Sequence, residues 1–367
     1  MTLGQIALWG LVVGFVMSMV VITGFAYTTL LERKVLARMQ ARVGPNRAGY
    51  LPLPGRGKKE RKLLGGFMQP AADAVKLFFK EDPTPGKVDK VVYNLAPMLA
   101  VIPAILILAV IPWAGKIPGL VPAQYDYFAI VPGLNVAVLF ILAVTSISVY
   151  GIVLAGWASN SKYAILGGIR ASAQMISYEL VMGLTIIIPV MLANSMDLGV
   201  IVQGQQNGWY VFLAPLAAIV FCIAVLAELQ RSPFDLLEAE QELSAGFNVE
   251  YAGMRFGMFF MAEYMKMVSL SAIAATLFFG GYRGPFVDQI PVLGFVYMFI
   301  KIFIGLFLMI WIRATFPRLR YDQLMSFGWK KLLPIAVLQF VVLAIFLVMK
   351  EEGAFAPIEN AISSFFG

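Results

Sequence analysis

Long apolar runs constrain the fold of this chain more than any other feature. The first begins at Leu3 and lasts until about residue 30, and similar runs recur as far as residue 349. A helix of about 20 apolar residues crosses the hydrocarbon core of a bilayer, where every backbone polar group needs an internal partner. The chain is 60% hydrophobic, and its charged fraction of 13% is about half that of a soluble domain. The sequence therefore predicts an all-α polytopic membrane protein.

Hydropathy predicts eight transmembrane helices in a single membrane domain that covers residues 1–367. The predicted spans are about 3–30, 93–113, 132–156, 172–193, 209–228, 255–280, 293–316 and 332–349. The first apolar run has no basic segment before it and no A-x-A cleavage site, so we expect a retained helix and not a signal peptide. An even number of spans places both termini on the same side of the membrane.

Lysine and arginine are concentrated in four connecting segments. The loops 31–92, 157–171, 229–255 and 313–331 hold 23 of the 28 basic residues. Because basic loops stay on the cytoplasmic side of a membrane, we expect these loops inside and both termini on the outer, periplasmic side. We expect the bacterial cytoplasmic (inner) membrane in preference to an organellar inner membrane.

The first basic loop contains a short amphipathic segment, MQPAADAVKLFFKED, at 68–82. Pro70 suits the first turn of a helix. Helical spacing gives a charged face with Asp73, Lys76 and Lys80, and an apolar face with Ala74, Val75 and Phe78. A helix of about 12 residues is too short to span, so we predict that it lies in the membrane plane. The Pro-, Gly- and Lys/Arg-rich stretch before it, 50–66, is predicted to be a surface loop that contacts lipid headgroups or solvent.

Six ionisable residues lie within predicted spans or at their edges: Glu32, Glu179, Glu228, Glu263, Lys266 and Lys301. Each costs roughly 2.5–3.5 kcal/mol near the bilayer centre, so we expect them to face the protein interior or a hydrated cavity. Glu263 and Lys266 are three residues apart on one helix, so they either pair with each other or serve a function. Glu179 has no cation within one turn, which favours a role in proton handling. Lys301 either snorkels, pairs with a neighbouring helix or serves a function.

Five carboxylates gather in the stretch LAELQRSPFDLLEAEQELSAGF at 226–247. Glu228 stands at the membrane edge, with Arg231 as a candidate counter-ion. If the following segment is helical, one face carries Asp235, Glu238 and Glu242, and another carries Glu240. Like charges at this spacing repel one another, which favours proton exchange near neutral pH. A solvated acidic loop is the alternative interpretation.

The chain lacks the residues and motifs that several kinds of catalysis and metal binding require. The chain has one cysteine, Cys222, and no histidine, which excludes a cysteine-rich iron–sulfur site and a His-ligated haem. It contains no Walker A sequence, no G-x-G-x-x-G, no nucleophile elbow and no Cys/His metal spacing. We therefore expect no metal, no nucleic acid and no redox centre of its own, and any electron carrier must belong to another subunit.

Six segments carry a family resemblance, in order along the chain: ERKVLARMQARVGPNRAG, QPAADAVKLFFKED, GWASNSKYAILGGIRASAQMISYEL, AELQRSPFDLLEAEQELSAGFNVEYAG, FFMAEY and RLRYDQLM. They closely resemble the H-type membrane subunit family of proton-pumping NADH:quinone oxidoreductase, respiratory complex I. The resemblance covers nearly the whole chain, and motifs of this length are highly specific. It implies an eight-span subunit at the junction of the membrane arm and the electron-carrying peripheral arm.

The resemblance also implies roles for particular residues. The family forms most of the membrane-side entrance of the quinone chamber, while the quinone headgroup is held by His and Tyr of a neighbouring 49-kDa-type subunit. Residues expected to line or flank the chamber and the docking surface are Glu32, Arg33, Arg42, Asp73, Lys76, Lys80, Glu81, Arg170 and Arg231. Residues expected in the acidic proton path are Tyr178, Glu179, Glu228, Asp235, Glu238, Glu240, Glu242, Glu250 and Glu263.

The partners follow from the same resemblance. NADH, FMN and iron–sulfur clusters would reside on partner subunits, with quinone as the substrate. The partners would be the 49-kDa-type and terminal iron–sulfur-cluster subunits, the small A-, J- and K-type membrane subunits, the antiporter-like subunits, and membrane lipids. One departure from the family pattern is LPLPGRGKKERKLLGG, at 51–66, which is inserted between intact motifs. The resemblance therefore implies no particular contacts for residues 50–66.

Two other functions stay open at this point. One is the related membrane subunit of an energy-converting hydrogenase or a ferredoxin-linked complex, which shares this ancestry. The other is a stand-alone ion or proton transporter that uses Glu179, Glu263, Lys266 and Lys301. Transporters commonly contain two repeated halves with broken helices, and the sequence has no such internal repeat.

Overall fold

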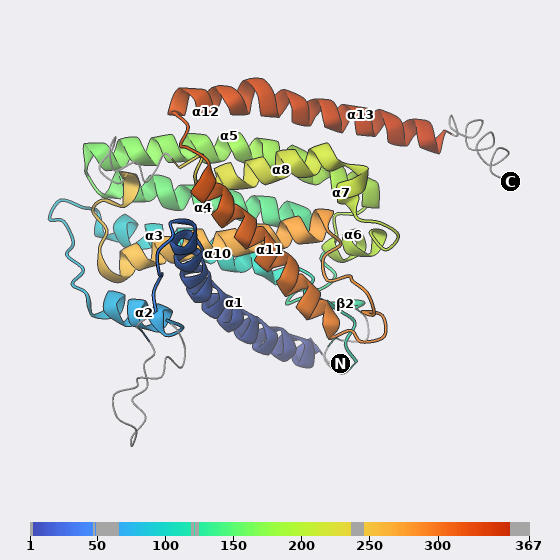
Figure 1. Cartoon of the computed structure of the whole chain (residues 1–367), viewed down its shortest axis with the longest axis horizontal. Helices are drawn as coiled ribbons and strands as arrows, with labels where there is room; N and C mark the ends of the chain where they lie inside the picture. Colours follow the sequence, from blue (N-terminus) through green and yellow to red (C-terminus); the bar gives the residue numbers. More distant parts are fainter. Residues whose placement is uncertain are drawn as a thin grey trace, which may run out of the picture.

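The computed structural model (Figure 1) describes residues 3–46, 48, 66–118, 121, 125–235 and 246–352. Most of these residues are helical. In addition, β1 (Ala114–Gly115) pairs with β2 (Tyr127–Phe128) in a short antiparallel ribbon. The predicted helical class is therefore confirmed for the part of the chain that the structure describes.

Within these ranges, seven helical segments are long and apolar enough to cross a membrane. They are α1 (Leu3–Met39), α3 (Lys90–Leu106) with the 3-10 turn η1 (Ile107–Ala109), α4 (Ala137–Ala158), α5 (Lys162–Ala193), α10 (Gly253–Phe278), α11 (Leu293–Thr315), and α12 (Tyr321–Phe327) joined through the π-helical turn η3 (Gly328–Leu332) to α13 (Leu333–Glu351). Seven of the eight predicted spans thus correspond to a long helix.

The predicted fifth span, 209–228, takes a different form. It consists of two short helices, α7 (Tyr210–Leu213) and α8 (Pro215–Glu228). The other short helical elements are α2 (Gln69–Phe79), α6 (Leu198–Gly204) and the 3-10 turn η2 (Gly246–Asn248). The fifth span is divided at Ala214, because Pro215 has no N–H to continue the preceding helix and instead begins a new one. α8 has 14 residues, about 21 Å of helix, which is shorter than a hydrocarbon core of about 30 Å.

Two helices extend further toward the basic loops than hydropathy predicts. α1 continues to Met39, past the predicted end at about residue 30, and α5 begins at Lys162, before the predicted start at 172. Hydropathy detects only the apolar part of a helix, whereas the backbone hydrogen bonds continue through polar residues. Glu32 therefore lies on a helix and not in the loop 31–92.

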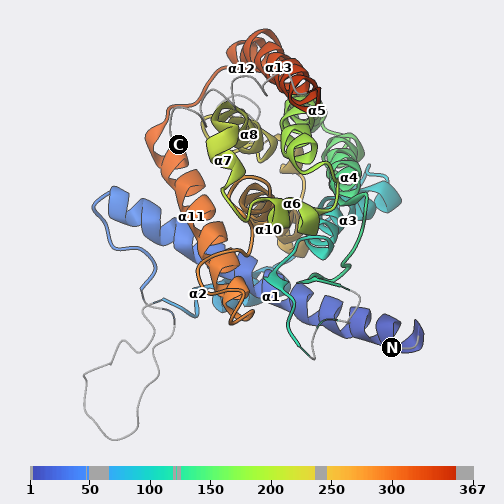
Figure 2. The ribbon, with the colours of Figure 1, turned by 90° about the vertical axis from the view of Figure 1, so that its right-hand side faces the viewer.

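α10 is the central helix of the bundle. In the end-on view of Figure 2 its neighbours surround it, and α3, α4 and α5 pack side by side in chain order. The largest hydrophobic core draws residues from α4, α5, α8 and α10. By contrast, α1, α11 and α13 lie at the periphery and expose large apolar side chains such as Leu11, Phe303 and Leu338. Apolar faces of this extent suit lipid tails or partner helices.

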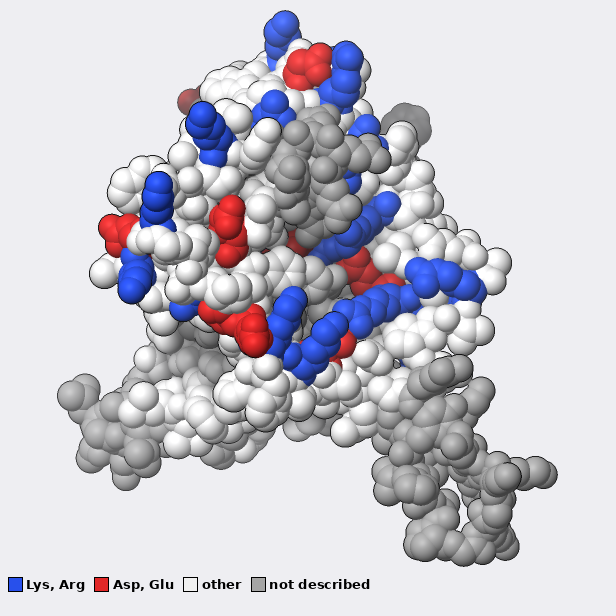
Figure 3. Space-filling model, turned by 90° about the vertical axis from the view of Figure 1, so that its left-hand side faces the viewer, with Lys and Arg blue, Asp and Glu red and all other residues white. Residues whose placement is uncertain are grey.

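Charged side chains gather at one end of the bundle (Figure 3). The start of α1, the end of α13 and the short helix α6 lie at the right-hand end in Figure 1, whereas α2 and the starts of α5 and α10 lie at the left-hand end. Figure 3 looks onto this second end, where Lys and Arg side chains gather together with Asp and Glu. We call it the charged end.

Candidate functional site

The side chain of Glu32 is a meeting point of four segments near the charged end. It comes from α1 and is only 3% exposed. Its carboxylate accepts hydrogen bonds from Arg231 Nη1 (3.1 Å), from the Tyr264 hydroxyl on α10 (2.6 Å) and from Arg313 Nη1 on α11. Two guanidinium groups therefore share one buried carboxylate, and they hold α1, α10 and α11 together at this point.

Arg231 extends the same cluster to a second carboxylate. Its Nε lies 2.6 Å from Glu263 Oε1, and its guanidinium lies 4.5 Å from the centroid of the Tyr264 ring. Burial disfavours the charged form of Arg231, but the carboxylates of Glu263 and Glu32 outweigh burial and raise the pKa of Arg231 above its ordinary value. Arg231 therefore stays charged and joins buried Glu32 and half-buried Glu263 in one cluster.

A second buried ion pair lies further along α10. Lys266 Nζ is 2.6 Å from Oε1 of Glu228, the last residue of α8, and donates a hydrogen bond of 3.1 Å to Ser148 Oγ on α4. The ion pairs at 2.6 Å thus join Glu263 to Arg231 and Lys266 to Glu228, and not Glu263 to Lys266, which was one of two predicted alternatives. Arg231, the candidate counter-ion of Glu228, pairs with Glu32 and Glu263 instead, so that prediction is wrong. The reason is burial, since Arg231 and Glu228 each need a counter-charge inside the protein.

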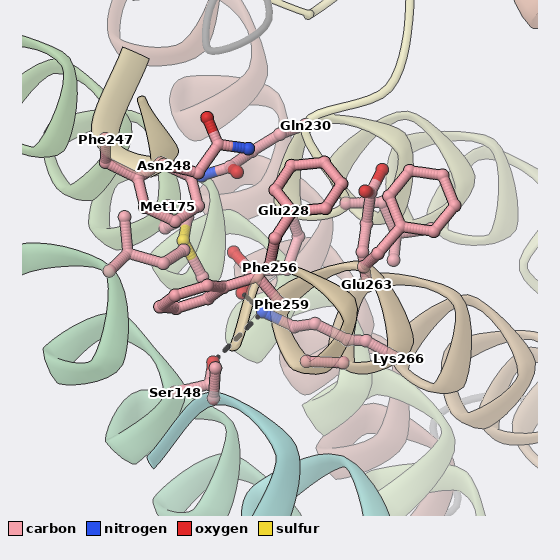
Figure 4. A pocket seen from close by; sticks show the side chains of 15 residues that line it. Ser148, Met175, Glu228, Gln230, Phe247, Asn248, Phe256, Phe259, Glu263 and Lys266 are labelled. Carbon is pink, nitrogen blue, oxygen red and sulfur yellow. Dashed lines mark hydrogen bonds and ion pairs between the residues drawn. The ribbon is translucent and has the colours of Figure 1, made fainter. Parts of the chain in front are cut away.

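Both groups of charges border one small cavity of about 80 Å³, drawn in Figure 4. Ser148, Glu228, Glu263 and Lys266 line it, and Figure 4 shows the lysine side chain extending toward Glu228 and Ser148. One water needs about 10–15 Å³ of such volume and two to four polar partners. The cavity therefore has the size and the polar lining to hold several waters between the two ion pairs.

Glu179 continues the series on α5. Its Oε1 accepts hydrogen bonds from the hydroxyl groups of Thr145 (2.9 Å) and Ser146 (2.6 Å), both on α4. Sequence reasoning considered only the missing cation near Glu179 and overlooked these hydroxyl donors. The available signal was the run TSIS at 145–148, which is polar within an otherwise apolar helix.

A large apolar cavity of about 760 Å³ lies between α1 and α11 and is open at the surface, where its lining residues Phe299 and Phe303 are exposed. Thr28 and Leu31, which lie within about one turn of Glu32 on α1, are part of its wall. Its other lining residues are Val20, Val21, Gly24, Tyr27, Leu30, Lys34, Phe67, Trp113, Val268, Val296, Phe299, Ile300, Ile302, Phe303 and Leu306. The structure thus brings an apolar cavity close to a buried cluster of charges.

A family model described as NADH dehydrogenase matches residues 12–344 of this chain. The chain belongs to the NADH dehydrogenase family. It is 50% identical to the NADH-quinone oxidoreductase H-type subunit 2 of Geobacter metallireducens, over 87% of this chain and 90% of the relative. It is also 48% identical to the H-type subunit 1 of Geobacter sulfurreducens (89% and 91% covered) and 45% identical to the H-type subunit of Syntrophotalea carbinolica (93% and 95%). The family that the motifs resemble is therefore confirmed.

The family motifs at the charged end are joined by a contact between α1 and α2. Arg33 Nη1 lies 2.6 Å from Asp73 Oδ2, and Gln69 donates to the other oxygen of Asp73 (3.0 Å). Arg42 donates to Gln40 and lines surface hollows beyond the end of α1. The remaining motif residues on and just after α2 are exposed: Lys76, Lys80 and Glu81. These exposed charged side chains are among the residues predicted to line the docking surface.

Four other predicted site residues contact residues that belong to neither ion-pair cluster. The Tyr178 hydroxyl donates to the carbonyl of Leu324 on α12 (2.9 Å), and Arg170 lies over the ring of Tyr321. Asp235 lies 3.4 Å from Arg318, and the carbonyl of Glu250 accepts a hydrogen bond from Tyr93. The acidic residues Glu238, Glu240 and Glu242 lie outside the described residues, as does 50–65 of the predicted loop.

Sequence reasoning missed three residues of the buried clusters. Arg313 counted only as a basic loop residue, Tyr264 only as the end of the FFMAEY motif, and Ser148 not at all. Each acts through a partner more than 100 positions away in the chain, such as Glu32 for Arg313. Lys301 Nζ donates to the carbonyl groups of Gly281 and Arg283 in the connection between α10 and α11, a contact that none of its predicted alternatives named.

Proposed function

We propose that this chain is the membrane subunit of a proton-translocating NADH:quinone oxidoreductase that forms the quinone access chamber and the first part of the acidic proton path. One observation carries the proposal. Ionisable residues run from buried Glu32, beside the apolar cavity, through half-buried Glu263 and buried Glu228 to half-buried Glu179 on α5. Intramembrane charges are costly and mark ion or proton pathways by default.

The apolar cavity supports the quinone part of the proposal. A quinone combines a long apolar tail with a small polar headgroup, and ligand sites for such molecules are mostly apolar with a few polar groups. The cavity between α1 and α11 fits the tail, and the Glu32 cluster supplies polar groups close by. In this proposal the headgroup passes beyond this chain to a 49-kDa-type partner, where a terminal iron–sulfur cluster reduces it.

The proton path would work through coupled charges. When quinone is reduced, proton uptake changes the charge beside Glu32, which shares Arg231 with Glu263. Inside a protein such a change is felt strongly by neighbouring charges, because the surroundings screen little. The cavity between Glu263 and Glu228 has room for water to carry a proton, and the hydroxyl groups of α4 continue toward Glu179.

The membrane placement belongs to the same proposal. α7 and α8 together would form the fifth of eight spans, and α2 would lie in the membrane plane, since its Val75, Phe78 and Phe79 are exposed apolar residues. The charged end would face the cytoplasm and both termini the periplasm of a bacterial inner membrane. The gathering of Lys and Arg at one end supports this orientation (Figure 3).

The partners are proposed from the names of the relatives. Each is called a subunit of NADH-quinone oxidoreductase, which favours the quinone enzyme over a hydrogenase-type complex. The charged end would dock the peripheral arm, with its NADH, FMN and iron–sulfur clusters. The exposed faces of α1, α11 and α13 would contact lipids, the small A-, J- and K-type membrane subunits, and the antiporter-like subunits.

Photoaffinity labelling tests the chamber. A quinone with a photoreactive group on its tail is bound to the purified complex, irradiated, and mapped by peptide mass spectrometry. We expect labelled residues on α1 and α11, and competition by unlabelled quinone. Labelling confined to other helices or to other subunits would contradict the chamber proposal. Robust ion flux by the chain reconstituted alone would instead support a transporter.

A further inference from the structure

Lys266 is not one of the carboxylates of the acidic path proposed above, yet it contacts one of them, Glu228, and lines the same cavity as Glu263. It lies inside α10 and is 8% exposed. A lysine at such a position costs roughly 2.5–3.5 kcal/mol when inserted. Its Nζ is 2.6 Å from Glu228 Oε1 and 3.1 Å from Ser148 Oγ. A carboxylate path alone does not need this cation.

Glu228, the partner of Lys266, has a hydrogen-bond partner for only one of its two carboxylate oxygens among the described residues. Glu228 is 1% exposed, and its second oxygen, Oε2, is buried without a hydrogen-bond partner among the described residues. An unsatisfied buried oxygen of this kind is rare and costly. Because Glu228 lines the cavity that can hold water, Oε2 is a place where a proton can bind while Oε1 still faces Lys266.

Lys266 also has a second carboxylate within reach. Glu263 precedes it by three residues on α10 and lines the same cavity. The Cβ atoms of residues at this helical spacing are about 5–6 Å apart. A lysine ammonium has three donors on a flexible four-carbon chain, so a rotation of the side chain suffices to change partners. Glu263 is held meanwhile by Arg231 at 2.6 Å.

Resting on the function proposed above, we propose that Lys266 is a mobile counter-ion that Glu228 and Glu263 share, and that its movement couples the cluster beside the quinone cavity to the inner part of the path. A proton that binds Glu228 Oε2 neutralises this carboxylate, and the ammonium of Lys266, which keeps all three of its protons, moves toward Glu263. Release of the proton toward Glu179 brings the ammonium back. Lys266 is thus a positioning residue and not a proton carrier.

The test uses the whole complex in proteoliposomes, with NADH oxidation and proton uptake measured together. For Lys266→Met we expect the number of protons pumped per NADH to fall by about twofold or more, since the shared charge is lost. Lys266→Arg keeps a positive charge on a long chain, so we expect this variant to pump nearly as many protons per NADH as the wild type. The matched control is Lys301→Met, another intramembrane lysine, which donates to backbone carbonyl groups outside the path.

A double-mutant cycle separates a shared counter-ion from a fixed ion pair. If Lys266 serves both carboxylates, Glu263→Gln lowers the same ratio, and the double variant Glu263→Gln/Lys266→Met is no worse than either single variant. Additive losses would overturn the proposal, as would a wild-type ratio in an assembled Lys266→Met complex. If the methionine variant does not assemble, Lys266→Gln, which can still hydrogen-bond Ser148, replaces it in the cycle.

The outcome also distinguishes this inference from the function on which it rests. A wild-type complex that oxidises NADH without pumping protons would contradict the proposed function itself. A wild-type complex that pumps, with loss of pumping in Glu228→Gln but none in Lys266→Met, would leave the function standing and remove only the role of Lys266.

Discussion

At the scale of single residues, Glu32 carries the largest concentration of contacts. It accepts from Arg231, Arg313 and Tyr264. Glu32→Gln would leave two arginines with one carboxylate fewer, and breaking a buried ion pair of this kind costs about 3–5 kcal/mol. We expect a clear fall in the thermal unfolding midpoint of the complex, measured by differential scanning fluorimetry.

The matched control for this prediction is Tyr264→Phe. It removes one hydrogen bond to a charged group, about 1.5–3 kcal/mol, and leaves both arginines paired. The fall in the midpoint should therefore be smaller than for Glu32→Gln. Equal stability of Glu32→Gln and the wild type would show that the Glu32 cluster does not hold α1, α10 and α11 together.

The same residues show how far a sequence predicts a site. The acids Glu32, Glu228 and Glu263 were identifiable, because a charge inside an apolar run is conspicuous. Their partners were not, since Arg231 and Arg313 reach Glu32 from 199 and 281 positions away. Residue spacing can predict only ion pairs between neighbours on one helix, such as Glu263 with Lys266. In the structure both residues pair with other segments instead, Glu263 with Arg231 and Lys266 with Glu228.

At the scale of the elements, the apolar cavity between α1 and α11 is open to a direct test. A Cβ added at Gly24 on α1 meets no atom within 4 Å, and Gly24 lines the cavity. Gly24→Leu should therefore fold, with a gain in helix propensity of up to about 1 kcal/mol, while filling part of the cavity. We expect kcat/KM to fall for long-tailed quinones and to change little for short-tailed ones.

Gly10 provides the control for this measurement. It lies on the same helix, also with no atom within 4 Å of an added Cβ, and it does not line the cavity. Gly10→Leu should leave kcat/KM for both quinones unchanged. If Gly24→Leu and Gly10→Leu behave alike toward long-tailed quinone, the cavity is not the quinone route.

The elements themselves were largely predictable, and their ends were not. Hydropathy located the seven long helices that the structure describes, since apolar runs are the property it measures. It could not foresee that α1 and α5 continue through polar residues or that Pro215 divides the fifth span. These differences matter for the site, because the polar extension of α1 carries Glu32.

At the scale of the whole molecule, the inserted stretch before α2 is predicted to be dispensable for chemistry. Gly66 packs directly against the backbone of Pro45, so the two flanks of the insertion lie side by side. A much shorter connection can therefore join them. We expect deletion of residues 52–63 to leave NADH:quinone reductase activity largely intact in membranes.

A variant with the same twelve residues in scrambled order is the control for the deletion, since it keeps length and charge. Complete loss of activity in an assembled deletion complex would contradict this prediction. Loss with the deletion alone would indicate that the length of the insertion is needed, and loss with both variants would indicate that its sequence is needed.

The function proposed for this chain is that its intramembrane carboxylates couple quinone reduction to proton movement. Its most direct test is the number of protons pumped per NADH oxidised in proteoliposomes that contain the complex with Glu228→Gln or Glu179→Gln. We expect assembled complexes whose quinone reductase rate falls and whose number of protons pumped per NADH drops by about tenfold. Wild-type rates with a wild-type pumping ratio in both variants would contradict it.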